Sequence, residues 1–181
     1  MSGIERITID ASLFVKLLFA NEVEFTEIKN KNNLGRNIQQ MSLDEFISSD
    51  AGIIFYDSKF TFTRKVKVFE NIFVDGDINI ANKSKKEILE WIICLKSDFG
   101  NVLFKNSKIR GETSAFKFAE CSTGNIKMYK SEIGDFEFAD CEIAKGADGK
   151  IEILDSKTGY FQFRRCKVGN IRIHRMSDTG Y

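Results

Sequence analysis

Thiols are the most reactive side chains in this chain, and three of its four cysteines stand in one repeated motif, Phe-x-x-Cys. The copies end at Cys121, Cys141 and Cys166. A cysteine becomes a nucleophile when cationic neighbours lower its pKa, and only Cys166 has such neighbours, Arg164 and Arg165. Small buried thiols explain the repetition without catalysis. We therefore expect reduced core cysteines in a cytoplasmic protein.

A charged residue precedes the cysteine in every copy of the motif. Glu120 and Asp140 occupy this position in two successive copies, and Arg165 occupies it in the third. Two stacked acids could share a proton or a cation, as in a carbohydrate-active β-helix enzyme. An ion pair between Asp140 and Arg165 explains the same column as a structural ladder. We expect no enzyme and no catalytic residue, and keep the carbohydrate-active enzyme as the alternative.

Basic side chains gather near the C-terminus. They are Lys157, Arg164, Arg165, Lys167, Arg172 and Arg175. They could bind phosphate or nucleic acid, but Glu152 and Asp155 dilute them, and the whole chain has a net charge of +1. We expect an acidic protein partner or protection of a sheet edge, and keep a phosphate- or nucleic-acid-binding module as an alternative.

No metal or cofactor site is predicted. His174 is the only histidine, so a two-histidine metal site is impossible, and no Cys-x-x-Cys pair suggests zinc. The turn Gly146-Ala-Asp-Gly149 resembles part of a calcium loop without the further ligands that such a loop needs. No stretch is long and apolar enough to span a bilayer, and the N-terminus lacks the apolar core of a signal peptide.

A second motif alternates with Phe-x-x-Cys. Its copies are Phe104-Lys-Asn-Ser107, Met128-Tyr-Lys-Ser131, Ile153-Leu-Asp-Ser156 and Ile173-His-Arg-Met176. The two motifs alternate every ten residues, with four extra residues after Ile109 and five after Ile143. The pattern predicts a solenoid with about 20 residues per coil, whose coils stack identical side chains in ladders.

Between Phe116 and Ile143 the expected inward residues follow a five-residue rhythm, with a second inward residue two positions before each centre. The centres are Phe118, Thr123, Met128, Ile133, Phe138 and Ile143. This rhythm resembles the pentapeptide-repeat proteins, over about residues 102–176. The resemblance implies a right-handed quadrilateral β-helix. Some members bind DNA gyrase through a strongly acidic surface, from which this chain departs in its net charge.

The position two before each centre alternates between large and small residues, instead of being small throughout. Phe or Ile stands on one face and Cys or Ser on the next, so we expect a rectangular cross-section. Gly124, Gly134, Gly159 and Gly169 follow the small faces and are expected to ease the corners.

We predict one all-β solenoid domain over residues 1–181, with coils from about residue 4 to residue 176 and seven or eight coils in all. Weaker coils are expected at 17–21, 66–71 and 78–82. Two short α-helices interrupt them near 42–49 and 84–96, each opened by a Ser-x-x-Glu capping box at Ser42 or Ser84. Strands at 53–55 and 102–104 follow these helices.

The predicted function is a non-catalytic protein-interaction or scaffold module, because a rigid solenoid without a catalytic group works through its extended surface. The second predicted helix is apolar nearly all round and contains Trp91, so the solenoid or a partner must cover it. Too few residues follow the last coil to form a helical cap. We expect either a homodimer through the C-terminal coil, as the family resemblance implies, or a chain that is a segment of a longer protein. The candidate partner-binding residues are Trp91, Arg164, Arg165, Arg172 and Arg175.

Overall fold

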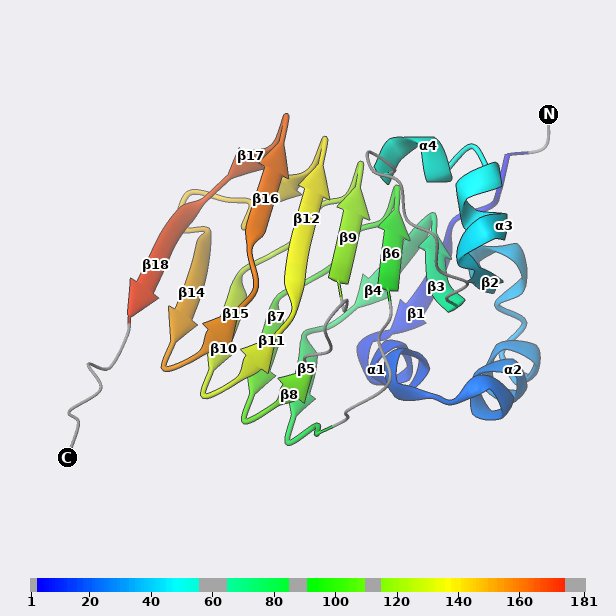
Figure 1. Cartoon of the computed structure of the whole chain (residues 1–181), viewed down its shortest axis with the longest axis horizontal. Coiled ribbons are helices and arrows are strands. Elements are labelled where there is room, and N and C mark those ends of the chain that lie inside the picture. Colours follow the sequence, from blue (N-terminus) through cyan, green and yellow to red (C-terminus); the bar gives the residue numbers. More distant parts are fainter. Residues whose placement is uncertain (1–2, 56–64, 85–90, 110–114, 175–181) are drawn as a thin grey trace.

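The chain folds into a β-solenoid of about four turns with a few short helices (Figure 1). The computed structural model describes residues 3–55, 65–84, 91–109 and 115–174. Four groups of stacked strands surround one core, which confirms the predicted solenoid.

The two larger sheets form opposite faces of the coil. The five-stranded sheet contains β5 (Ile78–Ala81), β7 (Val102–Lys105), β10 (Ile126–Tyr129), β14 (Lys150–Leu154) and β18 (Asn170–His174). The six-stranded sheet contains β2 (Ile38–Ser42), β3 (Lys65–Glu70), β6 (Trp91–Leu95), β9 (Ala115–Ala119), β12 (Asp135–Ala139) and β16 (Phe161–Arg164). Every pairing in both sheets is parallel except that of β2 with β3.

Shorter strands form the two remaining sides of the coil. One side contains β8 (Lys108–Ile109), β11 (Glu132–Ile133) and β15 (Lys157–Thr158). The other contains β1 (Ile7–Asp10), β4 (Ile72–Asp75), β13 (Glu142–Ile143) and β17 (Lys167–Val168). All of them have two residues except β1 and β4, which have four. From β3 onwards, paired strands are 20 to 25 residues apart in sequence, because some coils carry the inserted residues. The exception is β4, which pairs with the N-terminal β1.

The ladders of identical residues form as the repeat predicts. Phe118, Phe138 and Phe163 are register partners on the six-stranded sheet, with ring centroids 4.9 and 5.5 Å apart. Met128 lies in register with Phe104 on one side and Ile153 on the other, in the five-stranded sheet. The ten-residue alternation therefore places the two motifs on opposite faces of each coil.

The small residues form hydrogen-bonded columns between these faces. The Ser107 amide donates to Ser131 Oγ at 3.1 Å, and the Ser131 amide donates to Ser156 Oγ at 3.0 Å. In the other column, the Cys121 amide donates to Cys141 Sγ at 3.4 Å. Serine and cysteine are small enough to fit these positions. Their hydroxyl or thiol groups also accept a hydrogen bond from a backbone amide of the neighbouring coil.

Corner residues with positive φ turn the chain, and they are not the expected glycines. Two columns of such residues occur, with φ between 47° and 54° in both. The first column is Asn71, Lys96, Glu120, Asp140 and Arg165. The second column is Asn82, Asn106, Lys130 and Asp155.

Gly124, Gly134, Gly159 and Gly169 lie between strands as expected, but none has a positive φ. Three of them, Gly124, Gly159 and Gly169, allow close approach of the chain instead. A Cβ on Gly169 would lie 2.5 Å from the carbonyl oxygen of Gly149.

The first predicted helix is confirmed as α3 (Leu43–Ser48). Ser42 Oγ accepts from the Glu45 amide at 3.2 Å, and the Glu45 carboxylate accepts from the Ser42 amide at 2.9 Å. Its buried residues Leu43 and Phe46 cover the outer surface of the six-stranded sheet, in a second core outside the coil. The strand expected at 53–55 is wrong, because α4 (Gly52–Phe55) continues the helical segment.

The second predicted helix is wrong where the structure describes it. Residues 91–95 form strand β6, paired with β3 and β9, and residues 85–90 lie outside the described part of the chain. Ile92 and Cys94 point into the main core, whereas Ile93 and Leu95 lie in the second core under α3. A strand covered on both faces needs a continuous apolar sequence, which also resembles a buried helix.

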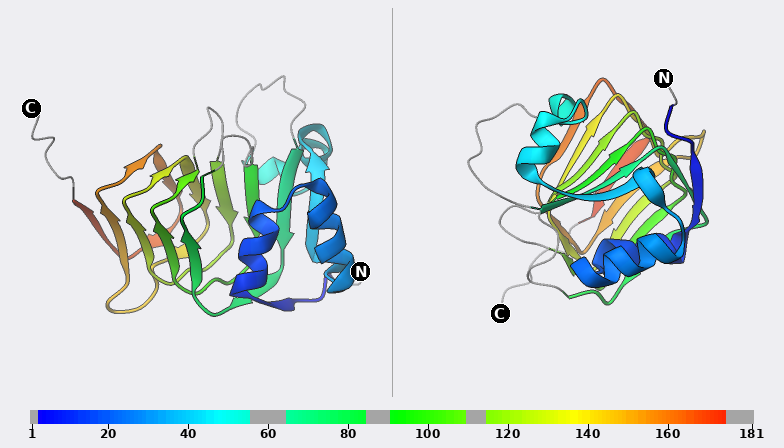
Figure 2. Two further views of the ribbon diagram at one scale, coloured as in Figure 1. Left: turned by 90° about the horizontal axis from the view of Figure 1, so that it is seen from below. Right: turned by 90° about the vertical axis from the view of Figure 1, so that its right-hand side faces the viewer.

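The strand β1 stacks on β4 close to the expected start at residue 4, but the segment that follows β1 is helical. After β1 come α1 (Ala11–Phe19), α2 (Glu22–Lys31) and the 3₁₀ turn η1 (Gly35–Asn37). The weak coil expected at 17–21 includes the end of α1. These helices lie at the N-terminal end of the solenoid (Figure 2), which explains why about four turns form instead of seven or eight.

Asp10 begins α1 by accepting from the amides of Ser12 and Leu13 at 2.8 and 3.3 Å. The helix then buries Phe14, Leu17 and Leu18 in the main core. A polar-surfaced helical layer therefore seals this end of the stack. No helix in the described ranges is long and apolar enough to cross a membrane.

Candidate functional site

The C-terminal end of the solenoid exposes its core. Ile151 and Ile153 of β14 are 1% and 6% exposed, whereas their register partners Ile171 and Ile173 of β18 are 50% and 68% exposed. All four point to the inside of the coil, and only the last pair lacks a further coil above it among the described residues. The end of the core is therefore an apolar surface.

On the opposite face, the exposure of the inward side chains also increases from the preceding coil to the last coil. Phe136 and Phe138 are buried, while Phe161 and Phe163 of the last strand are only half-buried. The rings of Phe136 and Phe161 stack at 5.0 Å with an interplanar angle of 5°. We call Phe161, Phe163, Val168, Ile171 and Ile173 the open end.

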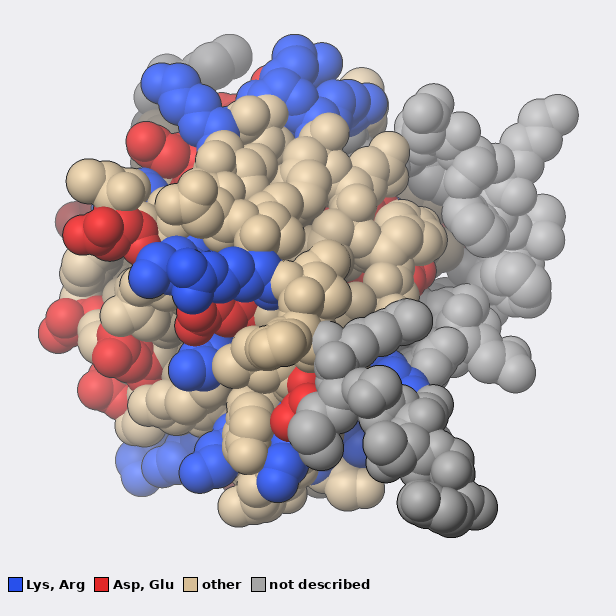
Figure 3. Space-filling view, turned by 90° about the vertical axis from the view of Figure 1, so that its left-hand side faces the viewer, with Lys and Arg blue, Asp and Glu red and all other residues tan. Residues whose placement is uncertain are grey.

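Cations surround the open end. The terminal coil, Lys157 to His174, contains five Lys and Arg residues and no Asp or Glu. They are Lys157, Arg164, Arg165, Lys167 and Arg172, and we call them the basic rim. Figure 3 faces this end and shows groups of Lys and Arg around an uncharged centre, with Asp and Glu along one side.

Four of these five cations lie next to an acid of the preceding coil. Lys157 is the register partner of Glu132, Lys167 of Glu142, and Arg172 of Glu152. Arg165 makes a two-point ion pair with Asp140, at 2.6 and 2.7 Å. Each of these four cations therefore has an acid on the side that faces the preceding coil.

The column of paired carboxylates is interrupted by an ion pair. Arg165 holds both carboxylate oxygens of Asp140, and these hydrogen bonds lower the pKa of Asp140. Asp140 and Glu120 are both corner residues. The predicted ion pair between Asp140 and Arg165 is confirmed.

The cysteines are structural. Burial raises the pKa of the Cys94 and Cys121 thiols, and also that of Cys166 despite its neighbouring arginines. The Cys166 thiol donates to the Arg164 carbonyl oxygen at 3.3 Å and accepts from the Cys141 amide. All four cysteines are free. A hydrogen bond with Cys121 lowers the pKa of the Cys141 thiol, which is buried between two coils.

The structure separates Trp91 from the arginines. Trp91 is half-buried beside the second core on β6, and the strands β9 and β12 lie between it and β16. The Lys117 ammonium lies 4.2 Å from the centroid of the Trp91 ring and 2.9 Å from a Glu137 carboxylate oxygen. Trp91 therefore contributes to the outer surface of the six-stranded sheet, not to the open end.

Arg164, Arg165 and Arg172 all belong to the terminal coil, but on different faces. Arg164 ends β16 and Arg165 follows it, whereas Arg172 lies in β18 of the opposite sheet. Arg175 lies outside the described residues. Sequence reasoning found the basic residues and expected an uncapped last coil, but it did not name the apolar residues that the open end exposes. Ile171 and Ile173 were the available signal, because they repeat the inward positions of Ile151 and Ile153.

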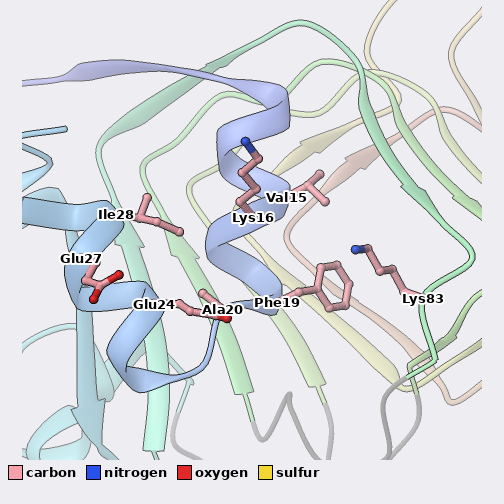
Figure 4. A pocket seen from close by; sticks show the side chains of 8 residues that line it. All are labelled: Val15, Lys16, Phe19, Ala20, Glu24, Glu27, Ile28 and Lys83. Atoms are coloured by element: carbon pink, nitrogen blue, oxygen red, sulfur yellow. The ribbon is translucent and has the colours of Figure 1, made fainter. Parts of the chain in front are cut away.

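Two hollows lie elsewhere on the surface. One, of about 350 Å³, lies between α1 and α2, with Lys83 facing Phe19 (Figure 4). Its floor is apolar, and Glu24 on its wall already accepts the Asn21 amide. The other, of about 480 Å³, crosses the outer surface of the five-stranded sheet. There Asn101 and Asn125 accept backbone amides of the next coil, at 2.9 and 2.7 Å.

Metal-ligand clusters are absent from the described residues, where no three His, Cys, Asp or Glu side chains could hold an ion together. His174 is exposed at the end of β18. The segment from Gly146 to Gly149 is a turn closed by a 3.1 Å backbone hydrogen bond between these two residues.

No family model, curated protein or solved structure matches this chain. The geometry of the chain itself therefore carries the functional argument.

Proposed function

We propose that this chain is a non-catalytic protein-interaction module, and that the open end is its binding surface. The observation that carries the proposal is the exposure of Ile171 and Ile173 at the end of ladders that are otherwise buried. Solenoids need a polar cap at each end to remain soluble. Helices cover the N-terminal end here, and in this proposal a protein partner covers the exposed isoleucines of the other end.

The aromatic ladder supports the same proposal. Phe161 and Phe163 lie 6.0 Å apart, nearly parallel to each other, and each stacks on a ring of the preceding coil. Their outer faces extend the apolar surface of the two isoleucines. Rigid aromatic and aliphatic groups on a fixed frame lose little entropy on binding, and such groups commonly dominate the energy of protein interfaces.

Kinship with the pentapeptide-repeat proteins is part of the proposal. The four-sided coil supports it. The central residues of the five-residue rhythm also support it, because all of them are buried except Phe118, which is half-buried. The free thiols support a cytoplasmic setting. Arg165 engages both carboxylate oxygens of Asp140, which disfavours the carbohydrate-active alternative. Cleavage of any member of a polysaccharide panel by the purified chain would contradict a non-catalytic role.

The test is selective loss of a partner. The wild-type chain and an Ile171→Asp/Ile173→Asp variant are used to capture proteins from the source cells, and each captured protein is then purified and titrated by calorimetry. We expect direct binding by the wild type and loss of binding by the variant, because two carboxylates would be buried in the interface.

Val23→Asp is the matched control, because Val23 is 67% exposed on α2 at the other end of the molecule. We expect this variant to bind as the wild type does. Unchanged binding by a folded Ile171→Asp/Ile173→Asp variant would overturn the proposal. Circular dichroism melting of all three proteins separates loss of binding from loss of folding.

A further inference from the structure

Charge alternates from coil to coil along the outer columns of the solenoid. On the five-stranded sheet, Lys127 lies 3.7 Å from Glu152, and Arg172 is the next register partner. On the short-stranded side, Lys108 lies 3.5 Å from Glu132, and Lys157 follows. Each column ends on a cation, so an acid is the residue that would continue it.

Strand β18 is also an edge. Among the described residues it pairs with β14 alone, so one row of its backbone amides and carbonyls faces away from the sheet. Such an edge is a template for another strand. Inward Ile171 and Ile173 alternate with outward Arg172, so an added strand would meet both an apolar and a cationic surface.

Resting on the proposed interaction function, we propose the chemistry of the partner: an extended segment of another protein that pairs with β18 as the next rung. It places apolar side chains over Ile171 and Ile173 and a carboxylate over Arg172. The chain contains this pattern already, since β14 sets Ile151, Glu152 and Ile153 against these same three residues.

A second copy of the chain fits this surface less well. A two-fold contact between open ends would bring the five cations of one basic rim towards the five of the other. Like charges across an interface oppose association. Nucleic acid also fits less well, because phosphates would lie against exposed isoleucines and stacked rings. An acidic and apolar strand satisfies both features together.

The test uses two blocked synthetic peptides, Ser-Ile-Glu-Ile-Ser and Ser-Ile-Lys-Ile-Ser, titrated into the isotope-labelled full chain. We expect the Glu peptide to shift the amide signals of residues 170–174 and to bind at least about tenfold more tightly than the Lys peptide. In the Arg172→Glu variant the preference should reverse. Lys105→Glu is the control, because Lys105 is exposed on β7 of the same sheet, and it should retain the wild-type preference.

Equal binding of the two peptides, or no binding of either, would overturn the inference. So would tighter binding of a single-stranded oligonucleotide to the same residues. A dimer in light scattering that Ile173→Asp dissociates would also overturn it. The proposed function has its own failure. If the Ile171→Asp/Ile173→Asp variant no longer binds the captured partner while the Arg172→Glu variant still does, the proposed binding surface is supported. The proposal of an acidic strand is then contradicted.

Discussion

The ammonium group of Lys67 lies 2.7 Å from the carbonyl oxygen of Leu17, inside the main core. It also donates to the carbonyl oxygens of Leu18 and Ala20, at 3.0 and 2.7 Å. Lys67 is only 6% exposed, and as the register partner of Ile92 it points into the coil. One lysine of the six-stranded sheet thus satisfies the last carbonyls of α1 and fastens the helical cap to the stack.

Lys67→Met should therefore destabilise the protein by about 2–3 kcal/mol, because it leaves buried carbonyl oxygens without their donor. Chemical denaturation measures the loss. Lys16→Met is the control, since Lys16 is an exposed residue of α1 and its change should stay within about 0.5 kcal/mol. Equal effects of the two substitutions would contradict the capping role of Lys67.

Cys141→Leu should destabilise by about 1–3 kcal/mol, because it overfills a position that is only 4% exposed between two coils. Cys141→Ser should cost less, since serine occupies the equivalent position at Ser131 and accepts the amide of Ser107 there. Thermal unfolding of both variants measures the difference. A melting temperature of Cys141→Leu equal to that of the wild type would refute the inward column of small residues.

Gly169→Ala should destabilise by about 1–3 kcal/mol. An added Cβ would lie 2.5 and 2.7 Å from the carbonyl oxygens of Gly149 and Ala144, and neither backbone atom can move without shifting a coil. Gly3→Ala provides the control, because no atom lies within 4 Å of its added Cβ. Urea unfolding compares the two, and the prediction fails if Gly169→Ala is as stable as Gly3→Ala.

Asp140 should titrate below the ordinary range of an aspartate, because Arg165 lowers its pKa. Its folded pKa lies below its unfolded pKa, so its stabilising contribution is present above the unfolded value and is lost as pH falls through the folded one. The carbon chemical shift of the carboxyl group measures the titration. Arg165→Gln should move the midpoint upward, and an unmoved midpoint would contradict the ion pair.

The sequence predicted the ladders well because close packing in a repeated coil restricts each position. Phe118, Phe138 and Phe163 recur at one place in the motif, and only a stack of equal coils brings them together. The helix at 42–49 was predictable for a local reason, since the capping box of Ser42 and Glu45 lies within one turn. The pair of Asp140 and Arg165 followed directly from the register.

Other features depended on contacts that no local pattern contains. Residues 91–95 form a strand because α3 covers its outer face while the core covers its inner face, and an apolar run alone does not distinguish this from a helix. Lys67 has no sequence neighbour that shows its burial. Its partners lie 47 to 50 residues away in α1.

The sequence by itself determined the repeat, the ladders and the charge of the terminal coil, because side-chain size and sign recur at a regular spacing. Only the tertiary structure decided that helices seal one end and which apolar residues the last coil leaves exposed at the other. Ile173 differs from Ile153 in no property of its own. It is 68% exposed where Ile153 is 6% exposed, because burial depends on the coil stacked above it.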